Sequence, residues 1–336
     1  MFKNTWKGKN GPLLIAEIGG NHEGSFSYAK KLTKLAIKSK VDVIKFQIYT
    51  GDTLVNKIYS PDRNKHFKKF QLSKDQHIYL AKMCRENGVR YLSSIWDLES
   101  LDWIDKYLDF YKIGSGDLTC YPIIKEFAKR GKPIILSSGL SKMEELNKTI
   151  KFLIKQNSKY KLNRNLSVLQ CTSTYPTLDQ EANLNVINSI SKIKNVTPGY
   201  SDHTIGNLAL KIAYSMGAQV LEFHFTDTRK NKTFRDHKVS LTPQETIELI
   251  NDINRIRKLK GSSIKQPTQN EIKTKHITSF RRAVFINKDC TKGYKVKKKD
   301  LIALRPNIGL DARDYKKIIG KKLKRKIKKF EKIILS

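Results

Sequence analysis

Short apolar runs alternate with amphipathic stretches along the first three quarters of the chain. Runs of four to eight residues that are rich in Val, Ile, Leu and Phe are typical of buried strands. They predict strands at residues 13–18, 41–47, 89–95, 110–113, 133–137, 166–171, 196–199 and 219–225. The stretches between them repeat their apolar positions with the period of a helix and predict helices that include 28–38, 74–87, 120–130, 142–155, 184–192 and 207–216. Eight such units in about 250 residues predict an α/β fold, a (β/α)8 TIM barrel.

The alternative α/β fold is a doubly wound open sheet that binds a dinucleotide. The first predicted strand leads into residues 19–24, which read GGNHEG. This segment lacks the GxGxxG spacing that such a fold uses to hold a pyrophosphate. The pattern therefore favours the barrel.

The chain changes character near residue 260. Residues 260–270 are polar and predict a linker, and beyond it short strands are predicted at 282–287, 294–296 and 301–304. We therefore expect a barrel domain at 1–260, a linker at 261–279 and a small, mostly β domain at 280–336. A domain of about 60 residues has a thin core. We expect it to dock on a barrel, its own or that of a second subunit.

Charge is the most unusual feature of the composition. The 336 residues include 66 Lys and Arg against 31 Asp and Glu, a formal net charge of +35. The lysines are spread over every predicted helix and loop, without a recognition helix, zinc finger or aromatic RNA-binding motif. Residues 316–332 concentrate charge, yet their Ile and Leu positions continue a buried pattern. Nucleic acid is therefore not the favoured partner, and an anionic small substrate explains the charge better.

The sequence lacks two kinds of segment that would direct the protein to a membrane or out of the cell. The chain has no apolar stretch of membrane-spanning length and no signal peptide at its start, which predicts a cytoplasmic protein without a membrane partner. The four cysteines stand far apart without a CxxC pair, which predicts reduced, structural thiols.

Polar residues follow the predicted strands at the ends where a TIM barrel carries its active site. His203 and His224 each stand near an acidic residue, so the two imidazoles could share one divalent metal while flanking carboxylates fix their tautomers. Lys45, Lys112 and several serines could cradle a phosphate with an attached carboxylate. Each residue also has a structural alternative, such as a helix cap or an ion pair between Lys45 and Glu17. Their joint placement at one rim favours a site.

Several motifs then carry a resemblance to a known family. They are IAEIGGNHEG at 15–24, VIKFQ at 43–47, KIGSGD at 112–117, GKPIILSSG at 131–139, GYSDHTIG at 199–206 and DHK at 236–238. In this order they resemble the sialic acid synthase family, whose members are N-acetylneuraminate synthase-like enzymes. The tail, with two arginines at 281–282 and RPNIG at 305–309, resembles the antifreeze-like SAF domain of that family.

The resemblance implies a reaction and a set of residues. The reaction is the condensation of phosphoenolpyruvate with an open-chain N-acetylated amino sugar, which gives a nonulosonic acid and phosphate and requires Mn²⁺ or Mg²⁺. The implied metal ligands are His203 and His224, which are also catalytic together with Glu17. The implied phosphoenolpyruvate contacts are Lys45, Lys112, Ser115, Ser137, Ser138 and Ser201. The implied sugar contacts are Gln47, Tyr175, Asp236 and Arg305. Arg305 would come from the SAF domain of a second subunit, which implies a homodimer with a swapped contact.

The resemblance does not identify which amino sugar is the substrate. N-acetylmannosamine is the leading expectation, and a 2,4-diacetamido-2,4,6-trideoxy hexose, the legionaminic acid precursor, is a close alternative; a pseudaminic acid synthase is less favoured. The chain departs from the family pattern at 93–97, at Ser173, at Phe223 and at Phe234-Arg235, where sugar-selecting loops are expected. An inactive member that binds sugar or polyanion is the alternative of another class. The intact Glu17, Lys45, Lys112 and histidines disfavour it.

Overall fold

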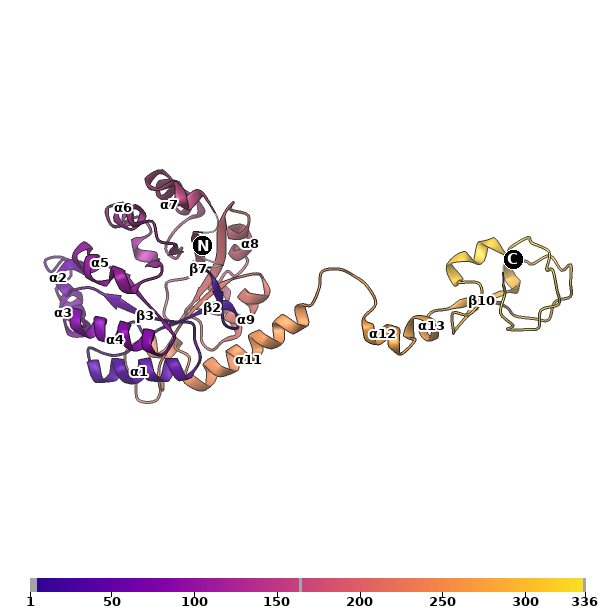
Figure 1. The fold of residues 1–336 in the computed structure, drawn as a ribbon, viewed down its shortest axis with the longest axis horizontal. Helices are drawn as coiled ribbons and strands as arrows, with labels where there is room; N and C mark the ends of the chain where they lie inside the picture. The colour runs from indigo at the N-terminus through magenta and orange to yellow at the C-terminus, as the bar shows by residue number, and fades with distance from the viewer. Residues whose placement is uncertain (1–4, 163–164, 335–336) are drawn as a thin grey trace. The chain divides into compact units, whose positions relative to one another are not determined.

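The computed structural model describes residues 5–162 and 165–334. The chain divides into two compact units, the first ending at Lys260 and the second beginning at Gly261 (Figure 1). Each unit has its own hydrophobic core and is described by itself. No helix in the described part of the chain has the length and apolar character needed to cross a membrane.

The first unit is a closed barrel of eight parallel strands, which confirms the predicted TIM barrel. Each strand pairs with its neighbour in sequence, and β2 also pairs with β9, so that Ile15 lies opposite Glu222 and the sheet closes. The strands are β2 (Gly11–Glu17), β3 (Val43–Ile48), β4 (Arg90–Ile95), β5 (Tyr111–Ile113), β6 (Ile134–Ser137), β7 (Leu166–Cys171), β8 (Val196–Asp202) and β9 (Val220–His224). A short strand that was not predicted, β1 (Lys7–Gly8), runs antiparallel to β2.

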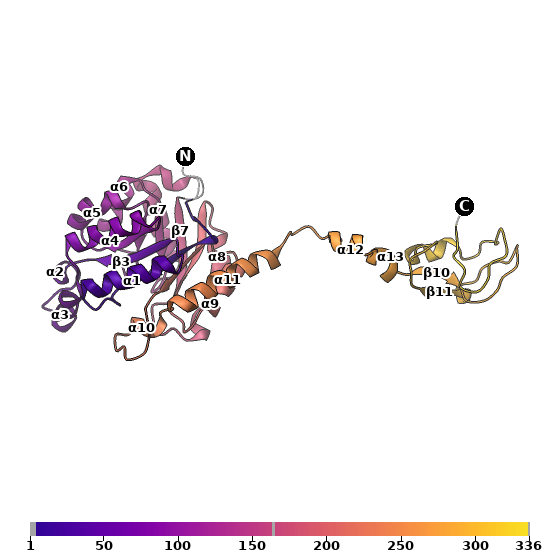
Figure 2. The ribbon, with the colours of Figure 1, turned by 60° about the horizontal axis from the view of Figure 1, so that its bottom comes forward.

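Helices surround the strands, and α11 packs beside α1 and α9 (Figure 2). Their ends follow capping chemistry: Ser73 and Gln76 form a capping box at the start of α4, and Gly131 ends α6 in the left-handed region at φ 72°. The helices are α1 (Phe26–Lys38), α2 (Gly51–Leu54), α3 (Pro61–Phe70), α4 (Lys74–Glu86), α5 (Leu98–Ile104), α6 (Tyr121–Arg130), α7 (Met143–Gln156), α8 (Val186–Ser191), α9 (Leu208–Ser215), α10 (Asp236–Val239) and α11 (Pro243–Lys260). Single 3-10 turns lie at η1 (Asp105–Tyr107), η2 (Ser115–Asp117), η3 (Ser158–Lys161) and η4 (Asp179–Glu181).

Strand alternation divides the barrel interior into an apolar and a polar layer. Trp6, Leu13, Ile15, Phe110 and other large side chains form one buried cluster inside the barrel. Alternate residues of a strand share a face, so the face that carries Leu13 and Ile15 carries Glu17 next. Likewise, Lys45 shares a face with Val43, and Lys112 shares a face with Phe110, because each pair is two residues apart. The apolar layer is thus a floor beneath a layer of charged groups.

The second unit contains one regular hairpin. Its strands, β10 (Ala283–Ile286) and β11 (Leu301–Leu304), are antiparallel. Its short helices are α12 (Gln269–Lys273), α13 (His276–Phe280), η5 (Lys298–Asp300) and η6 (Ala312–Lys317). The strand predicted at 294–296 is reduced to one bridge between Lys295 and Lys322, although Val296 is buried in the core of this unit and Tyr294 packs against it. Residues 261–279, predicted as a linker, include α12 and α13. The SAF identity of this unit stays a prediction.

Candidate active site

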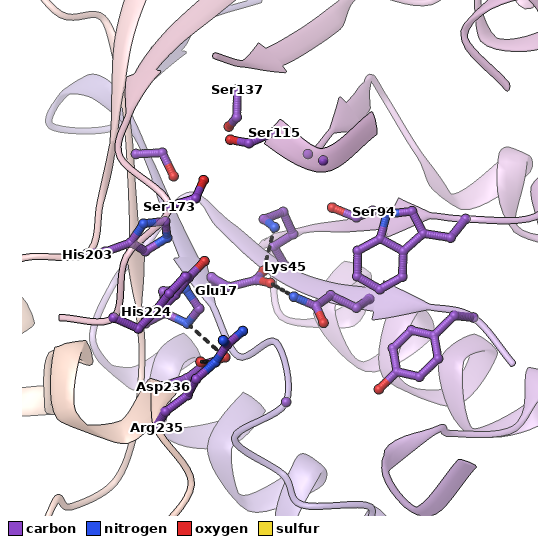
Figure 3. A pocket seen from close by; sticks show the side chains of 18 of the residues that line it. Glu17, Lys45, Ser94, Ser115, Ser137, Ser173, His203, His224, Arg235 and Asp236 are labelled. Atoms are coloured by element: carbon purple, nitrogen blue, oxygen red, sulfur yellow. Dashed lines mark hydrogen bonds and ion pairs between the residues drawn. The ribbon is translucent and has the colours of Figure 1, made fainter. Parts of the chain in front are cut away.

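A cavity of about 940 Å³ opens at the carboxyl ends of the barrel strands (Figure 3). This volume suits two small substrates bound together. Most of the predicted site residues line it, namely Glu17, Lys45, Gln47, Lys112, Ser115, Ser137, Tyr175, Ser201, His203, His224 and Asp236.

A buried charge network forms the base of the cavity. Lys45 Nζ lies 2.8 Å from Glu17 Oε2 and 3.7 Å from Glu222 Oε1. Lys112 Nζ lies 3.4 Å from the same Glu222 oxygen, which also accepts a hydrogen bond from Ser201. These four charged side chains are at most 8 % exposed. Two ammonium groups and two carboxylates therefore sit together out of water, where each depends on the others.

Burial and charge set the protonation of this network. Burial raises the pKa of Glu17 to about 7, although the nearby Lys45 ammonium opposes the rise. Burial also opposes the charge of Lys45, but the Glu17 and Glu222 carboxylates outweigh it and raise its pKa. For Lys112, burial is the stronger effect and lowers the pKa. The pKa of Glu222 is lowered because the two lysines outweigh its burial. Glu17 is therefore the carboxyl of this network that exchanges a proton near neutral pH.

Serine hydroxyls complete one side of the cavity. Ser137 Oγ accepts a hydrogen bond from Lys112 Nζ at 2.8 Å. Ser115 Oγ accepts one from the Gly139 amide, and a Cβ at Gly139 would lie 2.7 Å from that oxygen, so this position requires glycine. Ser138 differs, because its hydroxyl donates to the Leu169 carbonyl and the residue is not among those that line the cavity. Ser137 is therefore the serine of this strand end that faces the lysines.

The two histidine rings lie close enough to share one ion, with centroids 5.3 Å apart. His203 Nδ1 lies 2.7 Å from the Thr172 carbonyl oxygen, which can only accept, so Nδ1 carries the proton and Nε2 keeps its lone pair. His224 Nδ1 is buried without a hydrogen bond, and Asp236 Oδ2 lies 3.8 Å from it. Burial lowers the pKa of His224, helped by the nearby His203.

The expectation that flanking carboxylates fix the histidine tautomers is wrong. Asp202 instead accepts hydrogen bonds from the Tyr200 hydroxyl and the Thr204 amide. Glu222 faces the two lysines rather than either imidazole. Neighbouring residues on a strand point to opposite faces, so Asp202 is turned away from His203. The Thr172 carbonyl fixes the tautomer of His203 instead, and the carboxylate nearest to His224 Nδ1 among the described residues, that of Asp236, lies beyond hydrogen-bonding distance at 3.8 Å.

The donor set fits a catalytic rather than a structural metal. Within residues 5–162 and 165–334, no group of three or more His, Cys, Asp or Glu side chains is arranged to hold an ion. The fit rests on the lone pair left on His203 Nε2 and on the buried, unpaired nitrogen of His224. With two protein ligands, substrate or water would complete the coordination, as catalytic ions require open positions.

Of the residues predicted to contact the sugar, Tyr175 and Asp236 lie beside the histidines. The Tyr175 ring centroid lies 4.1 Å from that of His203, and the Arg235 guanidinium lies 4.5 Å from the Tyr175 centroid. Arg235 also pairs with Asp236 at 3.2 Å. Gln47 donates to Glu17 Oε1 at 2.9 Å. Arg305 belongs to the second unit, where its guanidinium lies 5.6 Å from the Phe280 centroid.

Several cavity residues were missed by the sequence analysis. Cys171, expected to be a structural thiol, lines the cavity with its sulfur 3.8 Å from His203 Nδ1. The polar helix α3 and the loops around it supply a group of aromatic and basic side chains, and its weak apolar pattern gave no signal of a site. These lining residues are Tyr49, Arg63, His66, Phe67 and Phe70. Trp96 and Phe234 also line the cavity, and they lie in segments where sugar-selecting loops were expected.

The closed barrel and the polar cavity at the carboxyl ends of its strands are typical of TIM-barrel enzymes. The NeuB family model matches residues 32–265, and the chain belongs to the NeuB family. The resemblance to sialic acid synthases is thereby confirmed.

Relatives extend over nearly the whole chain. The N,N'-diacetyllegionaminic acid synthase of Legionella pneumophila is 33% identical over 93% of this chain and 90% of its own length. The pseudaminic acid synthase of Campylobacter jejuni is 30% identical over 94% of this chain and 93% of its own length. The crystal structure of N-acetylneuraminic acid synthetase from Leptospira borgpetersenii is 25% identical, covers 82% of this chain and 94% of its own, and superposes with a TM-score of 0.73.

Proposed function

We propose that this protein is a nonulosonic acid synthase that condenses phosphoenolpyruvate with an open-chain N-acetylated amino sugar and releases phosphate. The observation that carries the proposal is the cavity itself, where two buried lysines and two imidazoles converge in a NeuB-family barrel. The relatives named above are synthases of acids of this class. Most of the residues that the resemblance implied line this cavity, which supports the proposal. A membrane or nucleic-acid partner has no role in this function.

Phosphoenolpyruvate suits the side of the cavity formed by Lys45, Lys112 and the serines. Its phosphate and carboxylate would add negative charge, which the two ammonium groups and the hydroxyls of Ser115, Ser137 and Ser201 can accept. The buried carboxylates Glu17 and Glu222 already neutralise these lysines. When phosphoenolpyruvate binds, its phosphate and carboxylate would therefore replace the Glu17 and Glu222 carboxylates as partners of the lysines. Glu17 can take up a proton in response.

The amino sugar suits the opposite side, near the histidines. Gln47, Tyr175 and Asp236 offer polar groups to its hydroxyl and acetamido substituents. A Mn²⁺ or Mg²⁺ ion held by His203 and His224 would polarise the aldehyde when bound. Carbon 3 of phosphoenolpyruvate then bonds to the aldehyde carbon, whose oxygen gains a proton. Water adds at carbon 2, and the bond from that carbon to the phosphate oxygen breaks.

Two sugars are candidates. N-acetylmannosamine is the simplest aldehyde of this class and would give N-acetylneuraminic acid. The relative from Legionella, which aligns with nearly the whole chain, favours the 2,4-diacetamido-2,4,6-trideoxy hexose that gives a legionaminic acid. A pseudaminic acid precursor is the third choice.

The active enzyme is proposed to be a cytoplasmic homodimer. The second unit has only a small core of its own, which suits a domain that leans on a larger surface. Arg305 of this unit is proposed to reach the sugar in the barrel of the other subunit. Its guanidinium would contact the acyl group of the sugar.

Product analysis tests the proposed function. The full-length protein is incubated with phosphoenolpyruvate, Mn²⁺ or Mg²⁺ and a panel of hexosamine derivatives, and phosphate release and product mass are measured. We expect a product with the carbons of both substrates, formed only with metal. Absence of phosphate release with every sugar would refute the proposal. A salt-sensitive gel shift with duplex DNA in such a protein would instead favour the polyanion-binding alternative.

A further inference from the structure

Three rings in mutual contact line one side of the cavity mouth, and we call them the aromatic wall. His66 and Phe70 come from α3, and Phe234 comes from the segment before α10. The ring centroids are 4.3 Å apart for His66 and Phe70, 5.0 Å for Phe70 and Phe234, and 5.9 Å for His66 and Phe234. All three residues line the cavity. The wall thus offers two phenyl rings and one imidazole ring in a cavity whose base is charged.

The wall stands on the histidine side of the cavity. Its parts follow the neighbouring strands β9 and β3, on either side of β2, whereas Lys112 and Ser137 belong to β5 and β6. Phe234 is two residues from Asp236, whose carboxylate lies 3.8 Å from His224 Nδ1. Figure 3 shows Ser115 and Ser137 on the side of the cavity away from Arg235 and Asp236. A sugar whose aldehyde lies at the histidines can therefore extend its far end along the wall.

Glycine at position 20 makes room for this wall. A Cβ at Gly20 would lie 2.8 Å from Phe234 Cζ and 2.9 Å from Cε1. These distances are below any normal carbon contact, so any other residue at this position would displace the ring. The backbone itself permits alanine here, because Gly20 is not among the glycines with positive φ. Gly20→Ala therefore moves the wall without removing it.

The chemistry of the wall identifies what it can recognise. Aromatic faces gain free energy by covering apolar groups, whereas a hydroxymethyl or phosphate group placed against them loses water without gaining a hydrogen bond. The cationic groups at the rim already have aromatic partners: the Arg235 guanidinium lies over Tyr175, and that of Arg63 lies 5.7 Å from the Phe67 centroid. The far end of the sugar would therefore contact the rings of the aromatic wall.

We propose that the aromatic wall is the specificity determinant of the enzyme and binds an apolar terminus on the sugar chain. The matching substrate class is a 6-deoxy hexose with a second N-acetyl group, in preference to N-acetylmannosamine or its 6-phosphate. The inference rests on the proposed function and chooses between its candidate sugars.

The test compares kcat/KM for three aldehydes, namely 2,4-diacetamido-2,4,6-trideoxymannose, N-acetylmannosamine and N-acetylmannosamine 6-phosphate. A single methyl group in an apolar site discriminates roughly 10-fold or more, so the wild-type enzyme is expected to prefer the trideoxy sugar by at least that factor. Phe234→Ala should abolish most of this preference, by lowering kcat/KM for the trideoxy sugar much more than kcat/KM for N-acetylmannosamine. Gly20→Ala should shift the preference in the same direction. Tyr79→Ala, which removes an exposed aromatic side chain of α4 outside the cavity, is the matched control and should leave the preference intact.

The outcomes separate the two levels of inference. Preference for a hydroxymethyl or phosphorylated sugar, or equal losses on all sugars in Phe234→Ala, overturns the role of the wall and leaves the synthase activity standing. A loss of preference in both wall variants, with the control unchanged, supports it. Absence of phosphate release with every sugar in the wild-type enzyme overturns both proposals.

Discussion

Replacing Lys45 with methionine should destabilise the barrel strongly and in a pH-dependent way. The side chain is only 4 % exposed and pairs with Glu17 at 2.8 Å and Glu222 at 3.7 Å. Methionine preserves much of the volume but removes the charge. Glu222 keeps Lys112 as a partner, whereas Glu17 loses its only ion-pair partner among the described residues.

Removing one member of a buried pair costs about 3–5 kcal/mol, because the other charge stays buried and unpaired. Glu17 can reduce that cost by binding a proton. Its folded-state pKa is already raised to about 7 from 4.5, and the loss of Lys45 raises it further. A carboxyl with a raised pKa contributes stability below the unfolded pKa and loses it as the pH rises through the folded pKa. The penalty is therefore expected to be larger at pH 8 than at pH 5. The difference should be at most about 1.4 kcal/mol, the equivalent of one pKa unit, because the native Glu17 already titrates at about 7.

Urea unfolding followed by tryptophan fluorescence measures this difference. All three tryptophans belong to the first unit, so the signal reports on the barrel alone. Lys148→Met removes an exposed ion pair with Glu144 and should cost at most about 1 kcal/mol at either pH. A double variant with Glu17→Gln should recover part of the stability. Equal costs for Lys45→Met and Lys148→Met at both pH values would refute the buried network.

Three further predictions concern the metal, the second unit and the loop beyond β9. His224→Ala should reduce phosphate release at least about 100-fold without changing the circular dichroism spectrum; full metal-dependent turnover would contradict its proposed role. Arg305→Ala should raise KM for the sugar about tenfold or more and leave that for phosphoenolpyruvate nearly unchanged, and equal effects on both substrates would exclude the cross-subunit contact. Arg229 lowers the pKa of Glu245 to about 2, so the stability from this partly exposed pair, at most about 1 kcal/mol, is present above pH 4.5 and is lost as the pH falls through 2. Glu245→Gln should flatten the acid limb of an unfolding curve, and an unchanged limb would contradict this assignment.

Strand alternation was sufficient to locate much of the site from the sequence. Lys45 and Gln47 stand two positions apart on a predicted strand and therefore share a face, and both line the cavity. The same alternation distinguishes Ser137 from Ser138 once the phase of β6 is known, because Ile135 belongs to the interior cluster and Ser137 shares its face. Which face of β6 points into the barrel is set by the tertiary structure, so the sequence left both Ser137 and Ser138 as candidates.

The amino-acid sequence by itself determined the number of barrel strands, their alternation and the strand-end motifs, because these depend on local periodicity and on residue identity. Only the tertiary structure decided which groups meet. In the folded barrel β2 pairs with β9, His203 hydrogen-bonds to the Thr172 carbonyl, and Asp236 lies beside His224. The tertiary structure also brought α3 to Phe234, which the polar pattern of that helix did not indicate. Such contacts join residues tens to hundreds of positions apart, and a local pattern of burial carries no information about the partner across that distance.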